Sequence, residues 1–184
     1  MLVIVNKKKF VRFIAIILLI VSFMSVNSVL RLIYPLEYEV EISTYSEKFG
    51  LDKHLVMGII SAESGFDKDA VSSKNAVGLM QIKEETAQWC VERLDIKEDI
   101  SDLSDADVNI HIGCAYLDYL AGLFENEETA VAAYNAGLGN VRKWLENTEY
   151  SKDGKTLSKI PFVETEKYVE RVFSRKKTYK KLYE

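Results

Sequence analysis

The apolar residues form one long run near the amino terminus and then recur at helical spacings. From Phe10 to Leu30 the single charged residue is Arg12, and residues 13–21 contain no polar side chain. A helix of about 20 apolar residues can cross the hydrocarbon core of a membrane. The basic residues before the run favour a cytoplasmic amino terminus and an exported remainder. We therefore predict a basic cytoplasmic segment at 1–9, a single transmembrane helix at 10–30 and a linker at 31–36.

A cleaved signal peptide is the alternative interpretation of this run, because it also has a basic start and an apolar middle. Its best small-residue cleavage site, Val-Asn-Ser at 26–28, fits poorly. No cysteine lies near the end of the run, so a lipid anchor is not indicated. Either interpretation places the rest of the chain outside the cytoplasmic membrane: attached to it as a single-pass protein, or secreted after cleavage.

After the linker, apolar residues repeat every three or four positions, which is typical of amphipathic helices. Asp52 is a typical N-cap residue for one of them, and Pro161 precedes the last. The polar segment 67–82 is expected to be a loop. Helices are predicted at 38–49, 52–64, 84–94, 105–124, 127–136, 138–146 and 163–182. With no strand of useful length, residues 37–184 are predicted to form one all-α domain that can bury a sizeable core.

Composition and charge exclude several functional classes. The 184 residues have a formal net charge of −4, and the basic residues concentrate at the two ends, which does not suit nucleic acid. Cys90 and Cys114 are too few for a disulfide scaffold or a four-cysteine zinc site, and their spacing leaves a single disulfide open. His54 and His111 are expected at the surface or as helix caps. We therefore predict no metal and no cofactor.

One carboxylate lies on the apolar face of the predicted helix 52–64. Leu55, Val56, Ile59 and Ile60 form a stripe, and Glu63 follows on the same face. Burial raises the pKa of a carboxyl group, so that it keeps its proton near neutral pH. A general acid needs such a proton. From the spacing alone, pairing with a core arginine or capping of a loop is the favoured explanation of Glu63, so the spacing by itself does not assign a catalytic role.

Four sequence blocks follow one another in a suggestive order. The first is Glu-Ser-Gly-Phe at 63–66 and the second is Gly-Leu-Met-Gln-Ile at 78–82. The third is Ala-Tyr-Asn-Ala-Gly at 133–137, and the fourth is Ile-Pro-Phe-Val-Glu-Thr at 160–165, ahead of Tyr168 and Val169. Together they resemble the catalytic domain of the soluble, goose-lysozyme-like lytic transglycosylases, over about residues 37–175. The resemblance implies an α-helical, lysozyme-like domain that cleaves peptidoglycan.

The resemblance also implies roles for individual residues. Glu63 matches the catalytic acid/base, and Glu164 matches a structural glutamate that ties the last helix to the groove. Ser72 occupies the position of a groove serine, although its neighbour Ser73 stays an alternative. The implied substrate-binding residues are Ser72, Ser73, Gln81, Tyr134, Asn135, Phe66 and Met80, and the structural residues near the site are Gly65, Gly78 and Glu164.

Glycines and aromatic residues around the blocks have further interpretations. Gly65 can end its helix with a positive φ, and Gly78 can let the backbone approach a sugar. Phe66 is the aromatic residue most expected in the groove, and Met80 is expected in the core or on the groove floor. Core packing is expected for the other aromatic residues considered, which are Trp89, Tyr116, Tyr119 and Trp144.

The implied reaction needs one carboxyl group from the protein. Glycosidases commonly use two, but the nearby Asp67 and Asp69 match no nucleophile position. N-acetylmuramic acid (MurNAc) supplies an N-acetyl oxygen and a 6-hydroxyl group, so Glu63 alone could cleave its β-1,4 bond to N-acetylglucosamine (GlcNAc) and form 1,6-anhydro-MurNAc. Tyr134 and Asn135 would orient Glu63 or the N-acetyl group.

Two alternatives are a lysozyme-type hydrolase and a non-catalytic cell-wall binding or assembly module. The expected partners are peptidoglycan glycan strands, the membrane through the amino-terminal helix, and wall-synthesis or secretion machinery; nucleic acid is not expected. The sequence does not distinguish cleavage at chain ends from internal cleavage.

Overall fold

The computed structural model describes residues 12–16 and 26–184. The chain divides into two units, Met1–Leu36 and Glu37–Glu184. In the first unit, residues 12–16 and 26–33 are helical. Within the described residues, no helix combines the length and apolar character needed to cross a membrane. Residues 10, 11 and 17–25 of the predicted transmembrane segment 10–30 lie outside the described residues.

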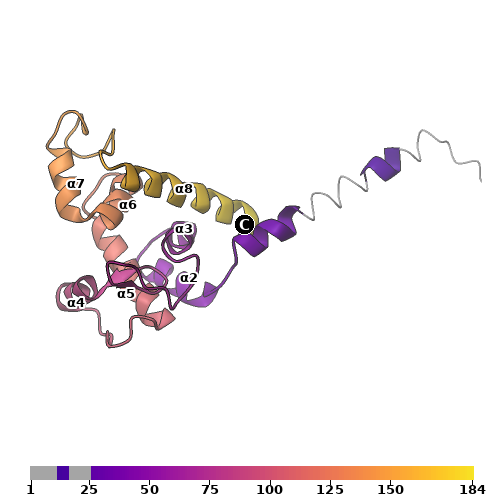
Figure 1. The fold of residues 1–184 in the computed structure, drawn as a ribbon, viewed down its shortest axis with the longest axis horizontal. Helices are drawn as coiled ribbons and strands as arrows, with labels where there is room; N and C mark the ends of the chain where they lie inside the picture. Colours follow the sequence, from indigo (N-terminus) through magenta and orange to yellow (C-terminus); the bar gives the residue numbers. More distant parts are fainter. Residues whose placement is uncertain (1–11, 17–25) are drawn as a thin grey trace, which may run out of the picture. The chain divides into compact units, whose positions relative to one another are not determined.

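The second unit contains seven described helices and one small hairpin (Figure 1). The helices are α2 (Glu39–Lys48), α3 (Lys53–Glu63), α4 (Glu84–Arg93), α5 (Ala106–Ala121), α6 (Glu127–Ala136), α7 (Leu138–Leu145) and α8 (Val163–Tyr183). Every helix predicted for this region is present, with ends that differ by at most a few residues. The largest difference is in α5, which ends before Gly122 rather than at 124.

The polar segment 67–82 contains more structure than the predicted loop. Strands β1 (Ala76–Val77) and β2 (Ile82–Lys83) pair antiparallel, with Ala76 opposite Lys83 and Val77 opposite Ile82. Apolar alternation over two residues is too short to be recognised in a sequence. The hairpin leads directly into α4, so it places the end of the second sequence block beside the start of that helix.

Side-chain caps begin several of the helices. The Asp52 carboxylate accepts a hydrogen bond from the His54 backbone N–H at 2.8 Å, which confirms the predicted N-cap of α3. Asp105 and Asn126 cap α5 and α6 in the same way. These caps satisfy backbone donors that a helix leaves unpaired at its first turn.

Helix α3 lies in the core and packs closely against α8, which comes from the other end of the domain (Figure 1). Gly58 makes this approach possible, because a Cβ atom there would lie 2.8 Å from the backbone oxygen of Val172. Helix α5 packs against α2, α4 and α6. The close α3–α8 contact brings the carboxyl end of α3, and with it Glu63, next to the first turns of α8.

The structure corrects the prediction for the histidines and answers the open question on the cysteines. His54 and His111 are buried rather than at the surface, with 3% and 5% of their surface exposed. The His111 ring stacks on Tyr45, and its Nδ1 lies 2.6 Å from a Glu98 oxygen. The His111 ring can be buried at low cost because both of its nitrogens have partners, Glu98 and Lys48, and the sequence does not reveal those partners. Both cysteines are buried with free thiols.

Candidate active site

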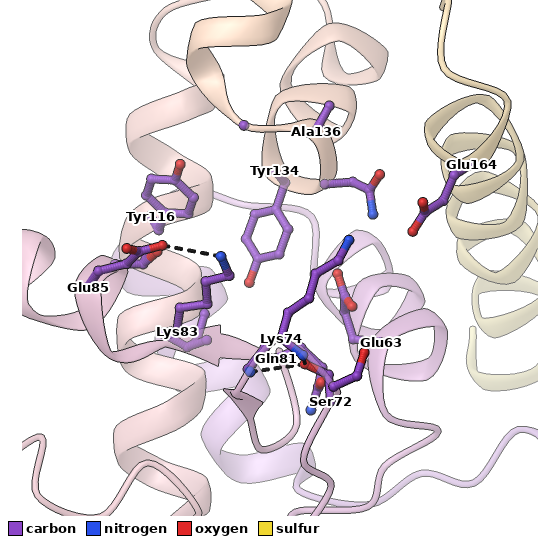
Figure 2. A pocket seen from close by; sticks show the side chains of 16 residues that line it. Glu63, Ser72, Lys74, Gln81, Lys83, Glu85, Tyr116, Tyr134, Ala136 and Glu164 are labelled. Carbon is purple, nitrogen blue, oxygen red and sulfur yellow. Dashed lines mark hydrogen bonds and ion pairs between the residues drawn. The ribbon is translucent and has the colours of Figure 1, made fainter.

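A cavity of about 530 Å³ opens where α3, the hairpin, α5, α6 and α8 meet (Figure 2). Its walls combine residues from all four sequence blocks. The lining consists of Glu63, Ser72, Ser73, Lys74, Ala76, Gln81, Ile82, Lys83, Glu85, Thr86, Tyr116, Tyr134, Asn135, Ala136, Gly137 and Glu164. Six residues named from the sequence as catalytic or substrate-binding lie in this one wall: Glu63, Ser72, Ser73, Gln81, Tyr134 and Asn135.

Glu63 is the last residue of α3 and is largely buried. Burial raises the pKa of its carboxyl group to about 7, because the charged form is poorly solvated there. The Tyr168 hydroxyl donates a 2.7 Å hydrogen bond to Glu63 Oε1 and, together with the Arg171 charge, opposes this rise. Near neutral pH, Glu63 can therefore exist as either an acid or a base.

Two other carboxylates line the described cavity, and both differ from Glu63. Glu85 is exposed and lies 3.2 Å from the Lys83 ammonium nitrogen, while Glu164 is exposed on the first turn of α8. Asp67 and Asp69, the nearest acids to Glu63 along the chain, do not line the cavity. Asp67 accepts a hydrogen bond from the Asp69 backbone N–H, and Asp69 pairs with Lys68. Glu63 is thus the least exposed of the carboxyl groups that line the described cavity.

A buried asparagine that the sequence analysis did not single out holds the hairpin in place. Asn109 of α5 is fully buried, and its Oδ1 accepts a 2.8 Å hydrogen bond from the Met80 N–H. Its Nδ2 donates to the backbone oxygens of Val77 and Leu103 at 2.9 and 2.7 Å. The Tyr134 hydroxyl donates to the Met80 oxygen at 2.9 Å. Both backbone polar groups of Met80 are therefore fixed by side chains from other elements.

Gly78 lies against this asparagine and not against the cavity. It has φ +78°, and a Cβ atom there would overlap the Asn109 side-chain amide. Gly78 does not line the cavity, and the lack of a side chain there makes room for the asparagine. Gly65 follows the end of α3 with φ +64°, a conformation that suits a glycine after a helix.

Gln81 and Ser72 each use part of their hydrogen-bonding capacity to hold the loop. Gln81 Nε2 donates to the backbone oxygens of Ala70 and Gly78 at 3.1 and 3.0 Å, which leaves its Oε1 as an acceptor. Ser72 Oγ accepts from the backbone N–H groups of Lys74 and Ala76, which leaves its hydroxyl proton as a donor. Ser73 lies in the same wall, so the choice between the two serines stays open.

The tie between α8 and the groove differs from the predicted one. The Thr165 hydroxyl donates a 2.8 Å hydrogen bond to Asn135 Oδ1, and Tyr168 reaches Glu63. Glu164 lies at the cavity wall with its carboxylate directed inward (Figure 2) and makes no such tie within the described structure. Because Oδ1 of Asn135 is occupied, its amide N–H groups are the ones available to a ligand. The Tyr134 hydroxyl likewise donates its hydrogen bond to the Met80 oxygen and not to Glu63.

Two of the predicted substrate contacts lie in the core instead. Phe66 is 6% exposed, and its ring centroid lies 5.9 Å from that of Tyr179. Met80 is fully buried, with its sulfur against Gly113. Neither lines the cavity. The aromatic residue that does line it, besides Tyr134, is Tyr116, for which core packing was expected. A single sequence does not distinguish the inward from the cavity-facing side of a loop.

Comparisons with known proteins find similarity to lytic transglycosylases. The family model described as the transglycosylase SLT domain matches residues 41–157. The soluble lytic murein transglycosylase of Salmonella typhimurium is 35% identical over 145 residues, covering 77% of this chain and 22% of that protein. The membrane-bound lytic murein transglycosylase C of Pectobacterium atrosepticum is 32% identical over 160 residues, covering 74% of this chain and 44% of that protein.

A solved structure shows the same fold. The 70 kDa soluble lytic transglycosylase of Escherichia coli superposes with a TM-score of 0.73 at 32% identity, covering 83% of this chain and 25% of that one. The chain thus spans about a quarter of the length of the soluble relatives and less than half of the membrane-bound one. This likeness confirms the predicted lysozyme-like fold, which is mostly helical rather than all-α because it includes the hairpin β1–β2. From the match over residues 41–157, we conclude that this chain belongs to the family of the transglycosylase SLT domain.

Proposed function

We propose that the chain is a murein lytic transglycosylase that cleaves the MurNAc-β-1,4-GlcNAc bond of peptidoglycan and forms 1,6-anhydro-MurNAc. The observation that carries the proposal is the Glu63 carboxyl group, which is largely buried at the cavity wall and has a pKa raised to about 7. General acid–base catalysis works best when the pKa of the catalytic group lies near the working pH. Membership of the SLT family supports the choice of peptidoglycan as the substrate.

Glu63 acts twice in the proposed reaction. The protonated carboxyl group first gives its proton to the glycosidic oxygen, and the GlcNAc hydroxyl leaves. The MurNAc C1 centre is stabilised by the oxygen of its own N-acetyl group. The Glu63 carboxylate, now stabilised by the hydrogen bond from Tyr168, then takes the proton of the 6-hydroxyl group as that oxygen bonds to C1. The proton lost in the first step is regained in the second, and no water is consumed.

The hydrogen-bond donors that remain available in the cavity wall are proposed to bind the sugar substrate rather than Glu63. The Asn135 amide N–H groups and the Ser72 hydroxyl proton remain available after their internal hydrogen bonds are made. Donors held in place before the substrate arrives stabilise developing charge without a reorganisation cost. We propose that they bind the N-acetyl group and hold its oxygen toward C1.

The experiment that tests this function is mass spectrometry of the muropeptides released from purified peptidoglycan by the full chain. We expect products one water lighter than hydrolysis products, ending in 1,6-anhydro-MurNAc. Glu63→Gln should reduce release by about 10²–10⁴-fold, because it removes the general acid and base. Glu128→Gln, an exposed change on α6, is the matched control and should leave release unchanged.

Each of the other possible results of this experiment would indicate a different function for the chain. Products with a reducing end would mean a lysozyme-type hydrolase. No release by a well-folded protein would favour a wall-binding or assembly module. Full release by Glu63→Gln would contradict the assignment of Glu63 as the acid.

We further propose that segment 10–30 anchors the chain in the cytoplasmic membrane as a single-pass helix, with residues 37–184 on the outer side. The basic residues at 7–9 and the apolar run that follows support this topology. Cell fractionation of the full chain should place it in membranes after an alkaline wash, at its full mass of 21.0 kDa. A shorter, soluble product would instead indicate signal cleavage.

A further inference from the structure

A second hollow adjoins the catalytic cavity on its hairpin side. It has a volume of about 530 Å³ and is lined by Lys74, Asn75, Lys83, Glu84, Glu85 and Gln88. Three of these, Lys74, Lys83 and Glu85, also line the catalytic cavity. The two spaces therefore share a wall, and a ligand in the cavity can extend into the second hollow, here called the side hollow.

The lining of the side hollow differs in kind from that of the cavity. All six side chains are charged or carry an amide, and none is aromatic or aliphatic. A sugar ring has no flat apolar surface to stack on there. Charged groups of both signs instead suit a ligand that carries its own charges. The side hollow therefore fits a charged branch of the substrate better than a continuation of the glycan strand.

The two lysines of the side hollow are not equivalent. Lys83 Nζ lies 3.2 Å from Glu85 Oε1, so its charge is already paired. Lys74 has no ion pair within the described part of the chain. Figure 2 shows Lys74 on the Glu63 side of the cavity and the Lys83–Glu85 pair on the Tyr116 side. Lys74 is thus the cation at the junction that can accept an anionic group from a ligand.

The backbone around Lys74 forms a tight turn. Ser72 Oγ accepts the Lys74 N–H at 3.2 Å and the Ala76 N–H at 3.0 Å, and Asn75 has φ +58°. The Ser72 N–H in turn donates to the Ala76 oxygen at 2.9 Å. The position from which the Lys74 side chain extends is therefore fixed before any ligand binds, which lowers the entropic cost of using it.

We propose that the side hollow receives the peptide stem of the MurNAc unit being cleaved, and that Lys74 binds a carboxylate of that stem. The proposal rests on the proposed function, because it takes peptidoglycan as the substrate. The stem is attached to MurNAc through its lactyl group, so it must leave the cavity close to the sugar whose bond is broken. The stem carries free carboxylates, and Lys74 is the unpaired cation at the opening through which it would pass.

The test compares two substrates on the full chain: glycan strands that carry their peptide stems, and the same strands after an amidase has removed them. The measured quantity is the ratio of kcat/KM on the first to kcat/KM on the second. We expect Lys74→Ala to lower this ratio about two- to fivefold, as for the loss of one exposed ion pair. Lys74→Glu should lower it further, because it replaces attraction by repulsion.

Lys68→Ala is the matched control. Lys68 is a lysine of the same loop that pairs with Asp69 and lines neither space, so the control should keep the wild-type ratio. A ratio unchanged by both Lys74 variants, including one left unchanged by an equal loss of kcat/KM on the two substrates, would overturn the stem site. Circular dichroism of each variant verifies its fold. Failure of the wild type to cleave either substrate would instead refute the proposed function, so the two failures are distinguishable.

Discussion

At the scale of single residues, the burial that raises the pKa of the Glu63 carboxyl group also lowers the stability of the fold when that group is charged. Its pKa is raised from 4.5 to about 7 in the folded protein. Between these values the unfolded chain has lost the proton while the folded chain keeps it. Stability contributed by this proton is therefore complete below pH 4.5 and is lost as the pH rises toward 7. Above that range, folding buries a charge.

Glu63→Gln should consequently stabilise the domain at alkaline pH. The amide is neutral and can still accept the hydrogen bond from Tyr168. We expect the variant to be more stable than wild type by on the order of 3 kcal/mol above pH 8, since one pKa unit corresponds to about 1.4 kcal/mol. The difference should fall toward zero near pH 4. Thermal unfolding followed by circular dichroism at both pH values measures it, and an equal difference at the two pH values would contradict the pKa assignment.

Tyr168→Phe should separate the effect of burial on the Glu63 pKa from the effect of the Tyr168 hydrogen bond. The variant keeps the aromatic ring but removes the 2.7 Å hydrogen bond that opposes the rise in the Glu63 pKa. We expect the pKa of the alkaline limb of kcat to move upward and kcat to fall on the order of tenfold, because a hydrogen bond to a charged group is lost. Tyr183→Phe, at the far end of α8, is the control. A lower kcat with an unmoved alkaline limb would mean that Tyr168 only supports packing.

At the scale of elements, the hairpin depends on its neighbours. Strands of two residues cannot be stable by themselves. Two hydrogen bonds of Asn109, with Met80 and Val77, and the one from Tyr134 attach the segment 77–80 to α5 and α6. Gln81 and Ser72 line the cavity directly after this segment and from the loop before it. They therefore hold their positions only while these attachments are intact.

Gly78→Ala should break this arrangement. A Cβ atom at Gly78 would overlap the Asn109 amide, and alanine tolerates its φ of +78° poorly. We expect a loss of on the order of 3 kcal/mol in unfolding free energy, together with an activity loss beyond that explained by unfolding. Gly139→Ala, on the open face of α7, should instead be neutral or stabilise by about 0.5–1 kcal/mol. Denaturant unfolding of both variants tests the contrast, and equal stabilities would refute it.

At the scale of the whole molecule, residues 37–184 share one core. The reactivity of the two buried cysteine thiols can be used to follow the unfolding of that core. Cys90 and Cys114 are fully buried, and burial raises the pKa of the Cys90 thiol to about 12 and that of Cys114 further still. Both thiols are therefore protonated and shielded in the native state.

We expect the thiols of the native full chain to be inert to a thiol-specific reagent at pH 8. Both should react together as denaturant unfolds the domain, at the same midpoint as the loss of helical circular dichroism. Joint reaction follows because Cys90 on α4 and Cys114 on α5 pack in the same core. Reaction of one thiol well before the midpoint would show that α4 opens separately.

Much of this protein was predictable from its sequence by itself. Helix positions followed from apolar residues at three- and four-residue spacing, because one buried stripe suffices to stabilise a helix against a core. The inward location of Glu63 followed from the same periodicity. The Asp52 cap could be predicted because the backbone N–H that it accepts a hydrogen bond from lies only two residues away. These features depend on neighbours along the chain, and such neighbours are visible in a sequence.

Only the tertiary structure decided which groups meet around the cavity. Tyr168 reaches Glu63 across 105 residues, and Asn109 reaches Met80 across 29. Phe66 packs in the core rather than in the groove because α8 supplies Tyr179 as its neighbour. Hydrogen bonds and ring contacts over such separations depend on how helices pack, and a helical period says which face is buried but not what covers it.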